Sequence, residues 1–337
     1  MFVSGRDRNQ RRETFVTAAP STVDPSTSLP RLAVGPVIAD GLGTPYRPFR
    51  FFSTDGLALA GRDYAPATAS DRRPVVCLPG LTRNARDFEP VIARLVAARD
   101  GKPSRRVVTF DFRGRGASQY SPDAATYTPL QEFEDTRLGL SLLGIARITA
   151  FGTSRGGMVT MLSSLLAPGL VEAAVLNDIG PVIDLAGLLR IKGYVGKPIA
   201  ADIDWETLVT AMMHVNRSEY PRLDRAAFER FAHRLFKDVG GRPALDYDPA
   251  LAVSLTTVDE NTSLPDLWVP FEGLAAVPTL VVRGSLSDLL STETVAAMQA
   301  RHPRCEAIEV ADEGHAPLFD DPVSQDALLA WLDRVGA

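Results

Sequence analysis

Cysteine is scarce in this chain of 337 residues, which contains only Cys77 and Cys305. Two cysteines cannot form the disulfide framework of a small secreted domain, and they cannot supply a cysteine-based zinc site. Cys77 stands in the apolar run VVCLPG, where the expected role is a small side chain packed in the core. This cysteine content fits a reducing compartment, and we expect a cytoplasmic protein.

The sequence also lacks long apolar runs, an excess of positive charge and the short motifs of metal and phosphate binding. No stretch of about 18 apolar residues occurs and the N-terminus has no apolar signal core, so we expect neither a membrane span nor export. The formal net charge of -5 argues against a nucleic acid partner, which needs a clustered basic surface. Neither a His-Glu-x-x-His motif nor a Gly-x-x-x-x-Gly-Lys loop is found, so no metal or other cofactor is implied.

Hydrophobic patterning predicts an α/β fold. Residues 1–45 are rich in Ser, Thr, Pro and Arg without apolar periodicity, which indicates a flexible N-terminal extension. RPFRFF and LALAGRDY follow as two strand-like runs, and the STDG between them is typical of a hairpin turn. Short apolar runs then alternate with helical stretches, as a parallel sheet buried on both faces requires. We therefore expect a mostly parallel central sheet opened by an antiparallel hairpin.

The alternation of strands and helices is interrupted once. Between residues 181 and 266 three helical patterns take over, LAGLLRI, WETLVTAMMHV and AAFERFAHRLF. The alternation resumes with VPTLVVRG and ends with the amphipathic helix SQDALLAWLDRV. This order predicts a core of residues 46–180 and 267–337, with residues 181–266 as an all-helical lid over one edge of the sheet.

Ser154 is the first candidate for chemistry. It stands in AFGTSRGGMV, on the predicted turn between the strand ITAFGT and the helix RGGMVTML. In open α/β sheets, ligands bind beyond the carboxyl ends of the strands, where this turn lies. Gly152 and Gly156 permit a tight bend and a close approach of strand and helix. A simple helix cap requires neither glycine, so the pattern favours a nucleophile.

A serine hydroxyl needs a base that takes its proton, and the base needs a carboxylate that orients it. His315, in ADEGHAP, follows the strand CEAIEV and is the only histidine predicted at the same edge of the sheet as Ser154. Asp288, in GSLSDLLS after VPTLVVRG, is the predicted carboxylate. Its chief competitor is Asp178 in LNDIGP, which also follows a strand and which we interpret as a loop-fixing hydrogen-bond acceptor.

With these residues the sequence resembles the α/β-hydrolase superfamily. The stretch GTSRG at residues 152–156 matches the Gly-x-Ser-x-Gly nucleophile elbow of that superfamily. The order Ser154, Asp288, His315 matches its order of nucleophile, acid and base. The resemblance covers roughly residues 47–335 and implies the α/β-hydrolase fold with a helical cap insertion.

The resemblance also implies an oxyanion hole of two backbone N–H groups. One belongs to Arg155, the residue after the nucleophile, at the start of a helix. The other belongs to Leu81 in LPGLTRN. The preceding Pro79-Gly80 departs from the common His-Gly pair, and the triple-glycine variant is absent, so the resemblance makes bulky esters of tertiary alcohols a less expected substrate class.

These residues predict a serine hydrolase that needs no cofactor and cleaves carboxylic esters or lactones of small to medium apolar molecules through an acyl-enzyme. Two alternatives remain open: a C–C bond hydrolase or perhydrolase on the same triad, and a ligand-sensing receptor of similar fold. Arg83 and Arg155 are candidates for binding a substrate carboxylate, with ion-paired or solvent-facing roles as the favoured interpretation. Several apolar lid positions are expected to pack, and about a third of them to face the pocket: Leu188, Leu189, Ile191, Met212, Met213, Phe231 and Phe236.

Overall fold

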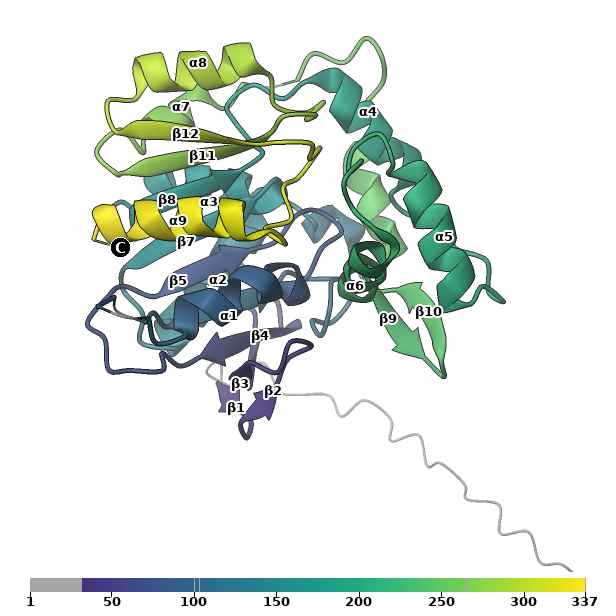
Figure 1. The fold of residues 1–337 in the computed structure, drawn as a ribbon, viewed down its shortest axis with the longest axis horizontal. Helices are drawn as coiled ribbons and strands as arrows, with labels where there is room; N and C mark the ends of the chain where they lie inside the picture. The colour runs from purple at the N-terminus through teal and green to yellow at the C-terminus, as the bar shows by residue number, and fades with distance from the viewer. Residues whose placement is uncertain (1–31, 100, 103, 265, 337) are drawn as a thin grey trace, which may run out of the picture.

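A ten-stranded sheet lies at the centre of the structure, a computed structural model that describes residues 32–99, 101–102, 104–264 and 266–336 (Figure 1). Its strands, in chain order, are β1 (Ala33–Val34), β2 (Ile38–Ala39), β3 (Pro45–Phe52), β4 (Ala58–Tyr64), β5 (Val75–Leu78), β6 (Val107–Asp111), β7 (Ile148–Thr153), β8 (Val171–Asn177), β11 (Thr279–Gly284) and β12 (Cys305–Val310). The order across the sheet is β1-β3-β4-β6-β5-β7-β8-β11-β12, with β2 paired to β3. Every pair from β6 across to β12 is parallel, and β3, β4 and β6 pair antiparallel. The predicted parallel sheet opened by an antiparallel hairpin is confirmed.

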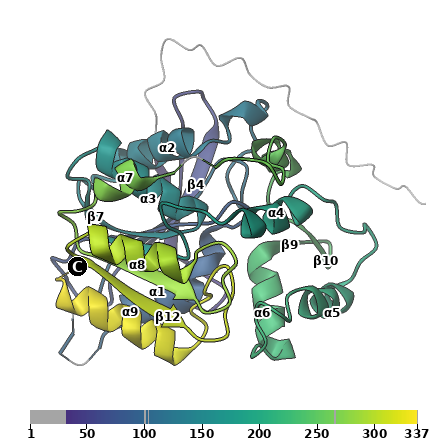
Figure 2. The same cartoon turned by 90° about the horizontal axis from the view of Figure 1, so that it is seen from above.

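Helices cover both faces of this sheet, because its central strands are apolar on both sides. In β5, Val76 and Leu78 belong to one buried cluster, while Val75 and Cys77 belong to another on the opposite face. Figure 2 shows α1 and α9 on one side of the sheet and α2 and α3 on the other. The core helices are α1 (Glu89–Val96), α2 (Pro129–Leu142), α3 (Arg155–Leu166), α7 (Trp268–Glu272), α8 (Thr292–Arg301) and α9 (Pro322–Arg334), with the 3-10 helices η1 (Ala85–Phe88) and η2 (Ala124–Thr126).

The N-terminal edge of the sheet begins earlier than predicted. Ala33 in β1 lies opposite Arg50 of β3, and Ile38 in β2 lies opposite Tyr46. The predicted flexible extension is therefore wrong for the stretch from β1 to residue 45, and residues 1–31 lie outside the described part of the chain. Strands of two residues are too short to show a period, so apolar periodicity offered no signal for them.

Residues 181–266, which we call the inserted segment, lie to one side of the sheet (Figure 1). This segment contains α4 (Leu185–Tyr194), α5 (Trp205–Val215), α6 (Arg225–Leu235), β9 (Phe236–Val239), β10 (Arg242–Leu245) and the 3-10 helix η3 (Pro249–Leu255). The three helices match the predicted patterns, but the antiparallel β9–β10 hairpin contradicts the expectation of an all-helical segment. Gly240 and Gly241, both at positive φ, form its turn, since a two-residue hairpin turn of this kind needs left-handed backbone.

The inserted segment has a small apolar core of its own, which also includes a residue of the loop after β12. Asp204 and Asp224 begin α5 and α6 by accepting hydrogen bonds from backbone N–H groups of the first turn. The buried side chains between these helices include Phe228 and Phe231, and Leu318 from the loop after β12 packs with them. Tyr220 donates a hydrogen bond of 3.0 Å to the carbonyl of Ala316 in the same loop. The inserted segment is thus joined to the loop that carries His315.

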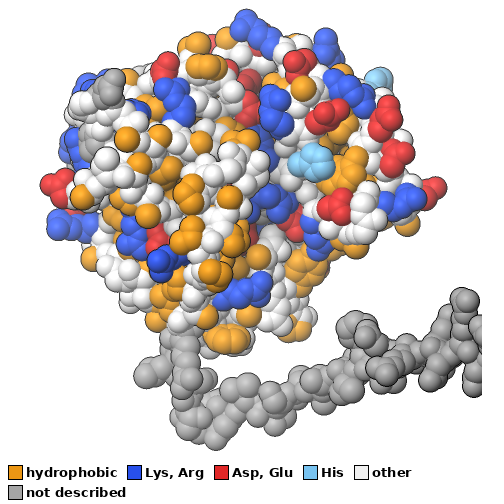
Figure 3. Space-filling model, turned by 60° about the horizontal axis from the view of Figure 1, so that its bottom comes forward, with side chains coloured by type: hydrophobic (Ala, Val, Ile, Leu, Met, Phe, Trp, Pro, Cys, Tyr) orange, Lys and Arg blue, Asp and Glu red, His pale blue; other side chains and the backbone are white. Residues whose placement is uncertain are grey.

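On the face shown in Figure 3, basic and acidic side chains are interspersed with apolar ones. Within the described ranges, no helix combines the length and the apolar character that a bilayer span requires.

Candidate active site

Ser154 sits on a strained turn between β7 and α3. Its backbone has φ 51° and ψ -111°, a conformation that costs a residue with a side chain of order 1–3 kcal/mol. A Cβ on Gly156 would lie 1.9 Å from the carbonyl oxygen of Leu78, and one on Gly152 would lie 2.4 Å from that of Gly156. Only glycine fits at these two positions, as the motif predicts. No hydrogen bond from the Ser154 side chain caps α3, so its hydroxyl is left for another partner.

That partner is His315, on the loop that follows β12. Its Nε2 lies 2.9 Å from the hydroxyl oxygen of Ser154, and its Nδ1 lies 2.8 Å from Oδ2 of Asp178. The carboxylate of Asp178 only accepts hydrogen bonds, so Nδ1 donates to it and Nε2 remains free to accept from the serine. The structure therefore brings Ser154 and His315 together as the sequence predicts, and it adds Asp178 as the third member.

Asp178 is fully buried at the end of β8, and its carboxylate holds two loops at once. Its Oδ1 accepts a hydrogen bond of 2.8 Å from the Gly284 N–H, and its Oδ2 accepts one of 2.5 Å from the Ser287 hydroxyl. The sequence interpretation of Asp178 as an acceptor that fixes a loop is thus correct but incomplete. The same carboxylate orients the imidazole of His315.

Asp288 does not reach His315, and the prediction that it does is wrong. Both of its carboxylate oxygens bind the guanidinium of Arg190 on α4, at 2.6 and 2.8 Å. Partial burial acts to raise the pKa of Asp288, but the hydrogen bonds and charge of Arg190 outweigh burial and hold that pKa below its ordinary value. The Ser287 hydroxyl anchors this loop to Asp178, and the next residue then faces the inserted segment.

The two predicted oxyanion residues, Leu81 and Arg155, both line a cavity that contains Ser154. The side chain of Arg115 donates a hydrogen bond of 2.7 Å to the carbonyl of Leu81 and pairs with Glu132 at 2.8 Å. The other oxygen of Glu132 pairs with the guanidinium of Arg155 at 2.7 Å. We call this chain of contacts the Arg115–Glu132–Arg155 network.

This network is buried and charged. The side chains of Arg115 and Glu132 are fully buried. Burial acts to raise the pKa of Glu132, but the charges of Arg155 and Arg115 outweigh it and lower the pKa, so the group is a carboxylate. The Arg155 side chain is thus ion-paired, as favoured from the sequence, whereas Arg115 and Glu132 were missed. No local signal marks them, because Glu132 stands beside Glu134 and Asp135 in the sequence, and Arg115 stands beside Arg113.

Two cavities meet at Ser154. One, of about 310 Å³, is largely apolar and is lined by residues that include Leu81, Met158, Leu188 and Ile191. The other, of about 50 Å³, is lined by residues that include Arg83, Asp87, Tyr194 and His315. Of the seven apolar lid positions, Leu188 and Ile191 line these cavities, and the others pack in the buried clusters: Leu189, Met212, Met213, Phe231 and Phe236.

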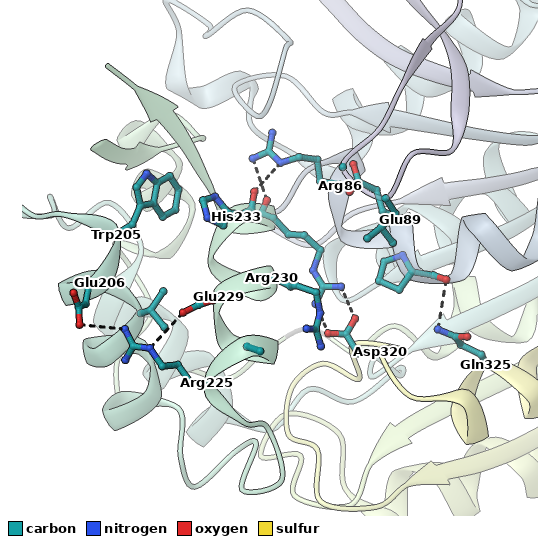
Figure 4. A pocket seen from close by; sticks show the side chains of 16 residues that line it. Arg86, Glu89, Trp205, Glu206, Arg225, Glu229, Arg230, His233, Asp320 and Gln325 are labelled. Carbon is teal, nitrogen blue, oxygen red and sulfur yellow. Dashed lines mark hydrogen bonds and ion pairs between the residues drawn. The ribbon is translucent and has the colours of Figure 1, made fainter. Parts of the chain in front are cut away.

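A larger crevice of about 1080 Å³ lies apart from Ser154, between α5, α6 and the core. Figure 4 shows Arg225 between Glu206 and Glu229. Arg234 pairs with Asp320, so much of the charge in this crevice is paired internally. Ser154 and His315 do not line it, whereas Ser154 lines both of the smaller cavities.

Comparison with known proteins finds similar sequences over most of the chain. The model of the alpha/beta hydrolase family matches residues 75–325. A 3-hydroxybutyrate-oligomer hydrolase of Cupriavidus necator is 35% identical over 257 residues, which is 74% of this chain and 85% of that protein. The sn-1-specific diacylglycerol lipase ABHD11 of Mus musculus is 26% identical over 260 residues, covering 77% of this chain and 80% of the lipase.

Solved structures are similar over most of the chain as well. An alpha/beta hydrolase from Novosphingobium aromaticivorans superposes with a TM-score of 0.78 at 40% identity, covering 86% of this chain and 98% of that one. E-2-(acetamidomethylene)succinate hydrolase, at 20% identity and a TM-score of 0.68, shares the fold.

Proposed function

The chain belongs to the alpha/beta hydrolase family, and on that premise we propose that it is a serine hydrolase of carboxylic esters or lactones. The observation that carries the proposal is the position of His315, within hydrogen-bond distance of both Ser154 and Asp178. This arrangement supports a triad in which Asp178, and not Asp288, is the acid.

The proposed reaction follows from this geometry. The hydroxyl oxygen of Ser154 attacks the ester carbonyl carbon while Nε2 of His315 takes its proton. The tetrahedral intermediate collapses, the C–O bond breaks, and the proton passes from His315 to the leaving alcohol. Water then attacks the acyl-enzyme by the same steps in reverse order and releases the acid. Asp178 holds the imidazole in the required tautomer and stabilises the imidazolium that forms twice in each turnover.

We propose the backbone N–H groups of Leu81 and Arg155 as donors to the oxyanion. Each such donor stabilises a transition state by roughly 2.7–4 kcal/mol. Their position beside Ser154 supports this role, as does the Arg115–Glu132–Arg155 network, which connects the loop of Leu81 to the start of α3 through one carboxylate. A rigid connection favours catalysis because preorganised donors need no rearrangement when the charge develops.

We propose the inserted segment, residues 181–266, as the lid over a core of residues 46–180 and 267–337. Its helix α4 contributes Leu188 and Ile191 to the apolar cavity and is bound to the core through Arg190 and Asp288. The apolar lining supports small to medium apolar acyl groups as substrates. Oligomers of 3-hydroxybutyrate, the substrate in the name of the relative from Cupriavidus necator, are the first esters to try.

The test combines active-site labelling with turnover. A fluorophosphonate should label wild type and Ser141→Ala, which lacks an exposed serine on α2, but not Ser154→Ala. Ser154→Ala should also lose at least about 10³-fold in kcat on p-nitrophenyl butyrate and on hydroxybutyrate oligomers. A folded Ser154→Ala protein that retains most of its hydrolysis would disprove the proposal.

A further inference from the structure

Arg83 lines the smaller cavity beside Ser154, and only part of its guanidinium is hydrogen-bonded to other residues. Arg83 lies in the loop between β5 and η1, and its side chain is 20% exposed. Its Nε donates a hydrogen bond of 2.6 Å to Asp87, and its guanidinium carbon lies 4.8 Å from the centre of the Phe231 ring. Within the described part of the chain, its two terminal nitrogens have no hydrogen-bond acceptor.

The other arginines near the site, Arg115, Arg155 and Arg190, each bind an oxygen acceptor through at least one terminal nitrogen, which sets Arg83 apart. Arg115 and Arg155 share Glu132, as described above. Arg190 binds Asp288 through Nε and one terminal nitrogen, and it binds Glu219 through the other. That arrangement shows how a guanidinium in this molecule serves two carboxylates at once. In Arg83 only Nε binds a carboxylate, so the two terminal nitrogens are left for a second one.

The position of His315 decides which part of a substrate lies beside Arg83. His315 lines the smaller cavity with Arg83, and it does not line the apolar one. In the proposed mechanism His315 gives its proton to the leaving alcohol, so the alcohol part occupies the smaller cavity and the acyl part the apolar one. The volume of about 50 Å³ restricts the alcohol part to a short one.

We propose that Arg83 binds a carboxylate on the alcohol part of the substrate, so that the preferred substrates are esters of short hydroxy acids with a free carboxylate. The inference rests on the proposed serine hydrolase function. In the reaction, the ester C–O bond of the acylated hydroxy acid breaks and water supplies the new O–H and C–OH bonds. One acid and one hydroxy acid are released, and the carboxylate at Arg83 is unchanged throughout. Asp87, bound at Nε, orients the plane of the guanidinium toward this ligand.

The experiment uses two substrates that differ in charge alone. These are 3-(butyryloxy)butanoate and 3-(butyryloxy)butanamide, in which the same ester bond is cleaved and a neutral amide replaces the carboxylate. Wild type should cleave the carboxylate with a kcat/KM roughly 10- to 100-fold higher, chiefly through a lower KM, because a hydrogen-bonded charge pair contributes a difference of that size. Arg83→Gln should abolish the preference by lowering kcat/KM for the carboxylate far more than for the amide.

Three further variants make the result specific. Arg83→Lys should keep part of the preference, since it retains the charge but not the planar fork. Asp87→Asn removes the competing carboxylate and should raise the preference several-fold. Arg137→Gln, an exposed arginine paired with Glu134 on α2, should change nothing.

The outcomes separate this inference from the proposed function. Equal rates of wild type on both substrates, or an equal loss on both in Arg83→Gln, would overturn the role of Arg83. Hydrolysis of the neutral amide and fluorophosphonate labelling of Ser154 would in that case still support a serine hydrolase. Absence of labelling together with absence of hydrolysis of either substrate would refute both.

Discussion

Oδ2 of Asp178 lies 2.8 Å from Nδ1 of His315, although 137 residues separate the two in the chain. The contact joins the end of β8 to the loop after β12, across the strand β11 that lies between them. Hydrogen bonds from Gly284 and Ser287 bring the loop after β11 to the same carboxylate. One buried side chain therefore positions the imidazole of His315 and fixes the loop that carries Asp288.

Asp178→Asn should lower kcat by about 10⁴-fold, whereas Asp288→Asn should stay within about threefold of wild type. In Asp178→Asn the Gly284 N–H keeps the new amide oxygen in the place of Oδ1, so the amide NH₂ faces His315 and forces the proton onto Nε2. Such an imidazole cannot accept the serine proton. Steady-state kinetics on one p-nitrophenyl ester compares the two variants. A comparable loss of kcat in Asp288→Asn would mean that Asp288 is the acid that orients His315.

The choice between the two aspartates shows where sequence reasoning ends. Both follow a predicted strand, both lie between Ser154 and His315 in the chain, and both were placed at the correct edge of the sheet. What separates them is a set of contacts made at long range, Asp288 with Arg190 and Asp178 with His315. Arg190 lies in the inserted segment, whose position over the core cannot be derived from periodicity.

The elements that could be predicted are those with a strong local pattern. The glycine-flanked Ser154, the fully buried strands β5 and β7 and the antiparallel hairpin of β3 and β4 follow from a few adjacent residues. The β9–β10 hairpin was missed because its first residue, Phe236, also continued the helical pattern of α6. Glu132 was missed because a buried charge is recognisable only once its two arginine partners are known.

Glu132→Gln should lower kcat roughly 10- to 100-fold with little change in KM. The substitution leaves two arginines without their shared carboxylate and loosens the loop of Leu81 and the start of α3 at Arg155. The proposed donors there act on the transition state more than on the bound ester. Because a buried ion pair is broken, the free energy of unfolding should also fall by about 3–5 kcal/mol. Steady-state kinetics at a temperature where the variant is folded measures the change in kcat. Thermal unfolding measures the change in stability separately.

Glu134→Gln is the matched control for this variant, because Glu134 is exposed on the same helix and pairs only with Arg137 within the described residues. It should leave kcat and stability close to wild type. The affinity for a trifluoromethyl ketone, which forms a tetrahedral adduct with the serine, should fall in Glu132→Gln in proportion to kcat/KM. A folded Glu132→Gln protein with normal kcat would show that the network supports the fold alone.

Leu188→Trp should shorten the acyl chains that the enzyme accepts. Leu188 lines the apolar cavity of about 310 Å³ beside Ser154, and a larger ring there fills space that a long acyl chain needs. For p-nitrophenyl octanoate, kcat/KM should fall at least about tenfold, while the acetate should stay within about threefold. Val215→Trp, at an exposed position of α5, is the control. An equal loss on both esters would place the acyl group elsewhere.

Glu313, two residues before His315, should make stability depend on pH. Burial raises its pKa from an ordinary value of 4.5 to about 7, and the nearby charges of Asp321 and Asp320 add to this, although the hydrogen bond from the Leu318 N–H opposes it. The folded chain thus holds this proton more tightly than the unfolded one. The contribution of the group to stability is complete below pH 4.5 and is lost as the pH rises to about 7, by at most roughly 3 kcal/mol.

Glu313→Gln removes this loss because a neutral amide replaces the carboxyl group and its oxygen can still accept from the Leu318 N–H, which lies 2.7 Å from the glutamate. The variant should match wild type near pH 5 and should become progressively more stable than wild type up to about pH 7, with a constant difference above it. Thermal unfolding of both proteins between pH 5 and 8.5 measures this, with the exposed Glu260→Gln as control. A difference that does not change with pH would mean that Glu313 titrates alike in the folded and unfolded chains.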